Sequence, residues 1–271
     1  MLMELFILII ILLLVCGVVA GFLAGFFGIG GGIIMVPVMY ALLSDLGYQD
    51  YAMNISVATS AAVILPTALA GTARNYRKEK FSLRPALILG VGGIIGSMAG
   101  STLSVLIPKQ VHVIAFSGFL IFMAFWMIIN QCSYFSRYSF RESVFIYIPL
   151  GIGVGIAAGL FGIGGGIILT PVLTSFLGVN IHRSVTMSLS AMVLIASGTV
   201  LSYIFLGWGL TGLFPFSLGY VNVLFAVVLA FASVPSVHLG VKAGMKMSEK
   251  NLLILFISML IFLAIQMVFS A

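Results

Sequence analysis

The chain has 271 residues, of which 62% are apolar and 7% charged, and twelve Lys and Arg against six Asp and Glu give a formal net charge of +6. A soluble domain carries roughly 25% charged residues, so this composition excludes a soluble globule, a disordered chain and a collagen-like fibre. Twelve basic residues in a chain of this length are also too few to form a face that binds nucleic acid. The sequence predicts an all-α polytopic membrane protein with no soluble domain.

Stretches without a formal charge give the expected membrane segments. Residues 5–44 form such a stretch of 40 residues. As a single helix it would be about 60 Å long, twice the roughly 30 Å hydrocarbon core of a bilayer, so it must fold back on itself. The later stretches are 51–73, 85–108 and 110–136 with one segment each, 143–182 and 184–241 (divided near Gly207) with two each, and 251–271 with one. The sequence therefore predicts ten membrane segments.

The basic residues support this number because they alternate between the two sides of the membrane. With ten segments, Lys109 stands alone on one side. The other side receives eleven basic residues, which are Arg74, Arg77, Lys78, Lys80, Arg84, Arg137, Arg141, Arg183, Lys242, Lys246 and Lys250. Eight segments would give a split of seven to five. The positive-inside rule therefore favours ten segments, or eight spans plus two re-entrant pieces, with the basic side in the cytoplasm and both termini outside.

The chain also contains an internal repeat. Residues 25–39 (GFFGIGGGIIMVPVM) and 159–173 (GLFGIGGGIILTPVL) are identical at eleven of fifteen positions, 134 residues apart. The echo continues with Ser56 and Ser60, which match Ser184 and Ser188. We therefore expect two membrane repeats, 1–136 and 137–271. Each holds five segments, an odd number, so the repeats must have inverted topology, as in secondary transporters whose substrate sites lie near the midplane.

Each repeat carries four glycines within five residues, at 28–32 and at 162–166, inside a hydrophobic run. Glycine in a helix interior costs about 1 kcal/mol relative to alanine, so this run predicts a discontinuous helix. Pro37 and Pro171 follow at equal spacing, and each fits the first turn of a short helix or a kink. The N–H groups at such a half-helix N-terminus suit a small anion. The alternative is that the glycines only allow close helix packing.

The candidate substrate-binding residues are the two glycine–proline motifs and polar residues of the segments that follow them. They are Gly28, Gly30, Gly31, Gly32, Pro37, Asn54, Thr59, Ser60, Gly162, Gly164, Gly165, Gly166, Pro171 and Ser188. Their hydroxyls and amides can donate to an oxyanion, although Ser and Thr also bond back to their own helices. The sequence has no HExxH motif, no nucleophile elbow and no intramembrane carboxylate pair. We therefore predict no enzyme activity, no metal site and no cofactor.

At the doubled glycine–proline motif the sequence resembles the TauE/SafE sulfite exporter family, also called the TSUP permeases. The resemblance covers nearly the whole chain, including the serine-rich segments and the Gly-Thr…Tyr elements that end at Tyr76 and Tyr203. It implies a cofactor-free permease of a bacterial-type inner membrane for sulfite, sulfonates, sulfoacetate or similar sulfur-containing anions. It also implies that the motif glycines and prolines contact the substrate.

The sequence thus favours a secondary transporter whose partners are a small anion and the lipid bilayer. A membrane potential that is negative inside favours anion exit by about 2.3 kcal/mol per charge per 100 mV. Export of a monoanion therefore needs no coupled ion, whereas uptake would require cotransported protons or sodium, and we expect export. The alternatives are an anion channel that uses the same site and a non-transporting scaffold.

Overall fold

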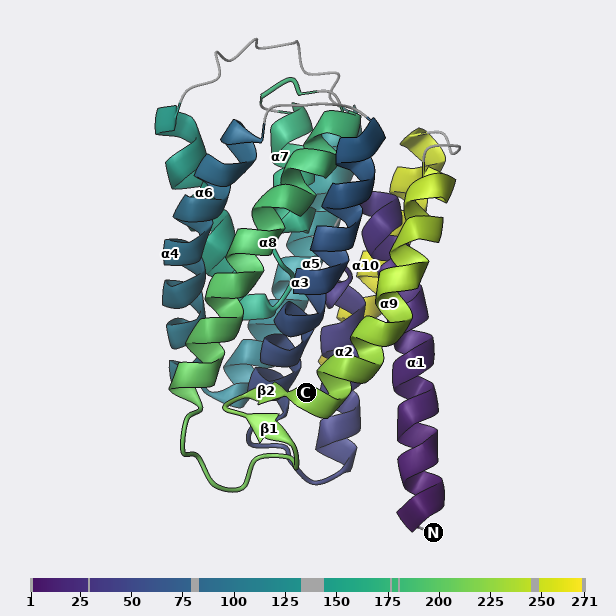
Figure 1. The fold of residues 1–271 in the computed structure, drawn as a ribbon, viewed down its shortest axis with the longest axis vertical. Helices are drawn as coiled ribbons and strands as arrows, with labels where there is room; N and C mark the ends of the chain where they lie inside the picture. Colours follow the sequence, from purple (N-terminus) through teal and green to yellow (C-terminus); the bar gives the residue numbers. More distant parts are fainter. Residues whose placement is uncertain are drawn as a thin grey trace.

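The computed structural model describes residues 2–28, 30–78, 83–132, 144–175, 177–179, 181–244 and 249–269. These residues form a bundle of ten α-helices (Figure 1). The helices are α1 (Leu2–Phe27), α2 (Gly32–Asp45), α3 (Ala52–Lys78), α4 (Arg84–Leu106), α5 (Lys109–Cys132), α6 (Val144–Phe161), α7 (Gly166–Ser175), α8 (Ile181–Leu206), α9 (Val223–Gly244) and α10 (Glu249–Phe269). A short antiparallel hairpin, β1 (Ser217–Leu218) and β2 (Val221–Asn222), precedes α9. The sequence analysis did not predict this hairpin.

The helices follow the predicted segments in order. Residues 5–44 form α1 and α2, and residues 143–182 contribute α6, α7 and the start of α8, so both 40-residue stretches fold back. The stretch 184–241 divides after Leu206, as predicted. Six helices of the described chain are long and apolar enough to cross a membrane, within α1, α3, α4, α5, α8 and α9. The predicted boundary between the repeats, at 136/137, lies outside the described residues.

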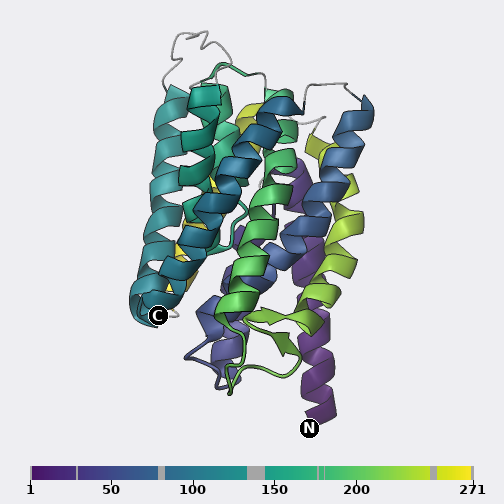
Figure 2. The ribbon, with the colours of Figure 1, turned by 60° about the vertical axis from the view of Figure 1, so that its left-hand side comes forward.

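The two halves of the chain interlock through close helix pairs. α1 packs along α9 and α6 packs along α4, while α3 packs on α8 and α5 on α10 (Figures 1 and 2). Glycines allow these approaches. A Cβ added to Gly96 of α4 would lie 2.1 Å from the Ile152 carbonyl oxygen of α6. A Cβ added to Gly21 of α1 would lie 2.3 Å from the Ser233 carbonyl oxygen of α9. Small residues of this kind let membrane helices pack backbone against backbone.

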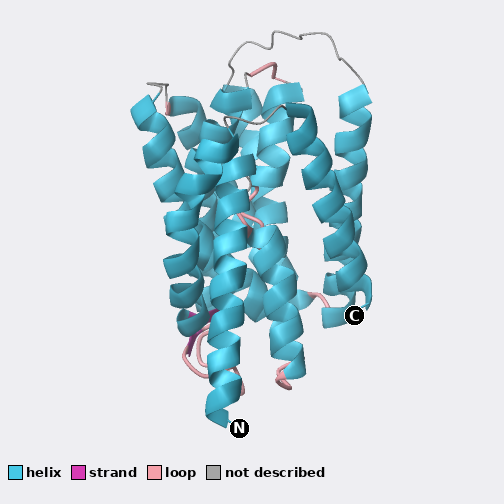
Figure 3. Cartoon of the chain, turned by 90° about the vertical axis from the view of Figure 1, so that its right-hand side faces the viewer, coloured by secondary structure: helices cyan, strands magenta, loops and turns pink. Residues whose placement is uncertain are grey.

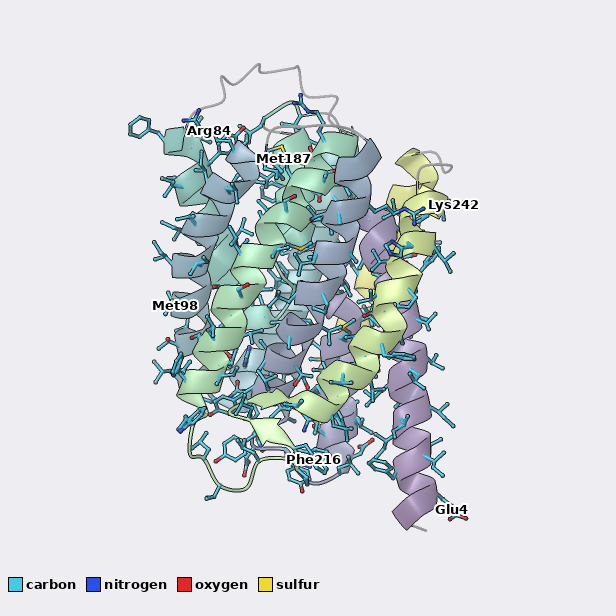
Figure 4. All side chains as sticks on the ribbon, viewed as in Figure 1. Glu4, Arg84, Met98, Met187, Phe216 and Lys242 are labelled. Carbon is cyan, nitrogen blue, oxygen red and sulfur yellow. The ribbon has the colours of Figure 1, made fainter. Side chains whose placement is uncertain are left out.

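The outer surface of the bundle is apolar, as expected where lipid is the solvent. Side chains project from the outer faces of several helices in Figure 4. Among the exposed apolar side chains are Ile95 of α4, Phe231 of α9 and Phe262 of α10, which are 61%, 78% and 67% exposed. A soluble protein rarely exposes so much contiguous apolar surface. The interior is also apolar, with Phe116 and Leu229 fully buried.

The charged side chains that the structure describes divide between the two ends of the bundle. Arg84 and Lys242 lie at the upper end in Figure 4, and Glu4 lies at the lower end. Lys109 lies 3.2 Å from Asp50, with which it forms an exposed ion pair. Of the eleven basic residues predicted on one side, seven have side chains outside the described part of the structure. Both chain ends lie toward the lower end (Figures 1 and 3).

Candidate functional site

The two glycine runs break their helices, as the sequence predicts. α1 ends at Phe27 and α2 begins at Gly32, while α6 ends at Phe161 and α7 begins at Gly166. Between them, Gly28, Gly30 and Gly31 have φ of 71°, 87° and 75°, and the corresponding Gly162, Gly164 and Gly165 have φ of 68°, 67° and 84°. Residues with a side chain rarely adopt such angles, and glycine adopts them freely. The helices are therefore discontinuous at both glycine runs.

The two breaks are buried and touch each other. Every described residue of 28–32 and all of 162–166 are buried. A Cβ added to Gly32 would lie 2.2 Å from the Gly162 carbonyl oxygen and 3.1 Å from the Ile163 Cα. In Figure 1, α2 leads from its break toward the lower end of the bundle and α7 leads toward the upper end. Two helical hairpins thus enter from opposite ends, and their tips meet inside the bundle.

Each break leads into the N-terminus of a short helix. The first backbone bonds of α2 run from the N–H groups of Ile34 and Met35 to the Gly31 oxygen, and those of α7 run from Ile168 and Leu169 to the Gly165 oxygen. The N–H groups before these residues precede the hydrogen-bond ladder and carry the positive end of the helix dipole. The arrangement therefore presents two sets of backbone donors inside the protein, without a basic side chain in either motif.

The sequence analysis offered two places for the motif prolines, the first turn of a short helix or a kink, and the structure places them beyond the first turn. Pro37 is the sixth residue of α2 and Pro171 the sixth residue of α7. The first-turn placement is therefore wrong. Because proline has no N–H, each removes one bond from the ladder, and the carbonyls of Ile33 and Ile167 lose their usual helical partner.

Two serines that match across the repeat connect each half of the chain to the break in the other half. The Ser60 hydroxyl on α3 lies 2.7 Å from the Gly162 oxygen and 2.8 Å from the Val57 oxygen, and can donate to either. The Ser188 hydroxyl on α8 donates to the Gly28 oxygen at 3.5 Å. Both serines are fully buried. In this structure, therefore, these hydroxyls satisfy break carbonyls, and an anion could receive them only after those bonds open.

Asn54 and Thr59 make polar contacts away from the two serines, and that of Thr59 is with the β-hairpin. The Thr59 hydroxyl oxygen accepts the Asn222 N–H at 3.0 Å, and the Asn54 side-chain oxygen accepts from Ser104 at 3.2 Å. The Tyr203 hydroxyl lies 2.6 Å from the Ser104 hydroxyl oxygen and 2.9 Å from the Gly159 carbonyl oxygen, and it can donate to either.

The network of Asn54, Ser104, Tyr203 and Gly159 joins α3, α4, α6 and α8 next to the second break, while Asn222 joins β2 to α3 through Thr59. The sequence analysis did not select Ser104, Tyr203 and Asn222 as site residues. For Tyr203 a signal existed, because the Gly-Thr…Tyr element occurs in both repeats. Ser104 and Asn222 have no such match, so only their contacts identify them.

Comparison with known proteins gives the family. The family model described as sulfite exporter TauE/SafE matches residues 13–267. The chain belongs to the TauE/SafE family. A probable membrane transporter protein of Methanocaldococcus jannaschii is 28% identical over 236 residues, 86% of each chain. One of Haemophilus influenzae is 29% identical over 253 residues, covering 89% of this chain and 91% of the relative.

A third relative, the probable membrane transporter protein YunE of Bacillus subtilis, is 25% identical over 261 residues, 90% of this chain and 91% of its own. No solved structure matches the chain. Together with its apolar helices, membership of the TauE/SafE family makes the chain an integral membrane protein of a transporter family, which fits a protein that is not an enzyme.

Proposed function

We propose that this TauE/SafE protein is a secondary transporter that exports small sulfur-containing anions, such as sulfite, sulfonates or sulfoacetate, across the plasma (inner) membrane. The observation that carries the proposal is the contact between two buried helix breaks, one from each half of the chain. Irregular backbone is tolerated at membrane depth only inside protein or beside a watery path, and paired broken helices of this kind surround the substrate in known transporter folds.

The packing supports two inverted repeats of five segments. Several contacts of the first half have counterparts in the second half. α1 on α9 corresponds to α6 on α4, and α2 on α3 corresponds to α7 on α8. Two repeats that enter from opposite sides would give this exchange of partners and would place both termini on one side, which the basic residues make the outside. The ten helices then comprise the two short helices α2 and α7, which begin inside the protein at the breaks, and eight other segments.

An anion at this site would be held by the N–H groups ahead of α2 and α7 and by the hydroxyls of Ser60 and Ser188. The two helix dipoles favour a negative charge at both breaks. The serine hydroxyls join when their bonds to Gly162 and Gly28 open. Rocking of one group of helices against the rest of the protein then exposes the site to each side of the membrane in turn. Because the membrane potential expels anions, export of a monoanion proceeds without a coupled ion.

The experiment is uptake of radiolabelled sulfite into liposomes that contain the purified protein. We expect saturable flux, which unlabelled sulfonates and sulfoacetate compete away. If none of these anions moves or competes, the substrate assignment is wrong. Flux that rises linearly with concentration and carries current would instead identify an anion channel. A thermal-shift screen against the same anions and small carboxylates tests binding, because a true ligand stabilises the folded protein. If none of these anions raises the unfolding midpoint, the protein is a scaffold.

A further inference from the structure

The point where the two breaks meet is lined by two apolar side chains, Ile64 of α3 and Met192 of α8. Both are fully buried. A Cβ added to Gly30 would lie 3.2 Å from the Met192 sulfur and 3.4 Å from the Ile64 Cγ2. One added to Gly164 would lie 3.0 Å from the Ile64 Cγ2 and 3.2 Å from the Met192 sulfur. The same two side chains therefore contact both breaks.

These residues are related to the bridging serines by one helical turn. Ile64 follows Ser60 by four residues, and Met192 follows Ser188 by four, so each pair shares one face of its helix. α3 and α8 pack on each other and run in opposite directions (Figure 1), α3 toward the upper end and α8 toward the lower end. Ser60 therefore lies on the lower side of the apolar pair and Ser188 on its upper side.

The surroundings of the pair are apolar as well. Ile64 and Met192 belong to a buried cluster with Ala68, Leu189 and Ala196, all from α3 and α8. None of these side chains can donate a hydrogen bond to an anion. An ion that enters such a layer loses its hydration without compensation, and apolar constrictions stop ions for this reason in channels.

We propose that Ile64 and Met192 form an apolar seal between two anion half-sites. One half-site is the Ser60 hydroxyl with the second break, and the other is the Ser188 hydroxyl with the first break, and one anion contacts both only after this layer has moved aside. The seal rests on the proposed transport function, in which the substrate crosses only when rocking of the bundles moves this layer aside. Methionine, which is unbranched and adaptable, suits a layer that must repack in each cycle.

The test measures passive chloride release from loaded liposomes that contain the double variant Ile64→Ala, Met192→Ala. We expect release above the rate of protein-free liposomes, and none above it for the wild type. The control is Leu120→Ala, which removes three carbon atoms, as many as Ile64→Ala removes, from a fully buried position on α5. This control should remain tight. A double variant as tight as the wild type would show that the barrier lies elsewhere.

Three single variants keep the test decisive if the double variant does not fold. Ile64→Thr and Met192→Gln nearly preserve side-chain size but add polar groups, and each should leak. Met192→Leu preserves both size and apolar character and should stay tight. Tight Ile64→Thr and Met192→Gln proteins would overturn the seal. Sulfur-anion flux of the wild-type protein tests the proposed function separately. If the wild type moves no sulfur anion, transport is refuted, and the chloride leak of the variants still decides whether the seal exists.

Discussion

Replacement of Gly32 by alanine tests the contact between the two breaks. Gly32 begins α2, so its backbone is helical and alanine is not strained there. The added Cβ would lie 2.2 Å from the Gly162 carbonyl oxygen, although real Cβ atoms essentially never come closer than 3.0 Å. The two breaks must therefore separate by about 0.8 Å, the difference between these distances. Overpacking costs about 1–3 kcal/mol, whereas helix propensity returns about 1 kcal/mol, so we expect a net loss of up to about 2 kcal/mol.

The measurement pairs thermal unfolding of the purified variant with its sulfite flux in liposomes. We expect both the unfolding midpoint and the flux to fall. The control is Gly153→Ala on α6, an exposed position where an added Cβ would meet nothing within 4 Å. This control should transport like the wild type and should unfold at the same or a higher midpoint, because alanine favours the helix and its Cβ meets no neighbour. A Gly32→Ala protein that unfolds and transports like the wild type would refute the contact between the breaks.

Three further predictions concern the polar groups around the site. Ser60→Ala leaves the buried Gly162 carbonyl without its hydroxyl donor and should lower the free energy of unfolding, measured with denaturant, by about 1–3 kcal/mol. The control Ser190→Ala removes only a bond to the previous turn of the same helix and should cost less. Equal losses would contradict a bridging role for Ser60. Tyr203→Phe removes the phenol hydroxyl from its network and should lower the unfolding midpoint, and an unchanged midpoint would show that this network contributes no stability. Burial raises the pKa of Tyr220, so folding favours the neutral phenol. The stability that Tyr220 contributes is complete below the unfolded pKa of about 10 and is lost as the pH rises through the folded pKa. Between about pH 9 and 11, the midpoint of thermal unfolding should therefore fall less steeply with pH for Tyr220→Phe than for the wild type.

The sequence by itself determined the order of the helices and the position of the helix breaks, because both follow from local physics. Residues 5–44 are too long for one crossing and too apolar for water, so the chain had to turn within them. Four glycines in five residues weaken a helix wherever they stand, and the turn falls at those glycines. Duplication of the motif identified the two matching sites, and Ser60 and Ser188 followed from the same alignment.

The tertiary structure alone decided what these elements contact. Ser60 meets Gly162, 102 residues away, and no local pattern states that its hydroxyl lies beside a carbonyl of the other half. The same holds for the network of Asn54 with Ser104, and for the apolar layer between the breaks. Ile64 and Met192 look like ordinary core residues in sequence. They lie between the two breaks only because α3 and α8 cross in opposite directions, a packing arrangement set by contacts between distant residues.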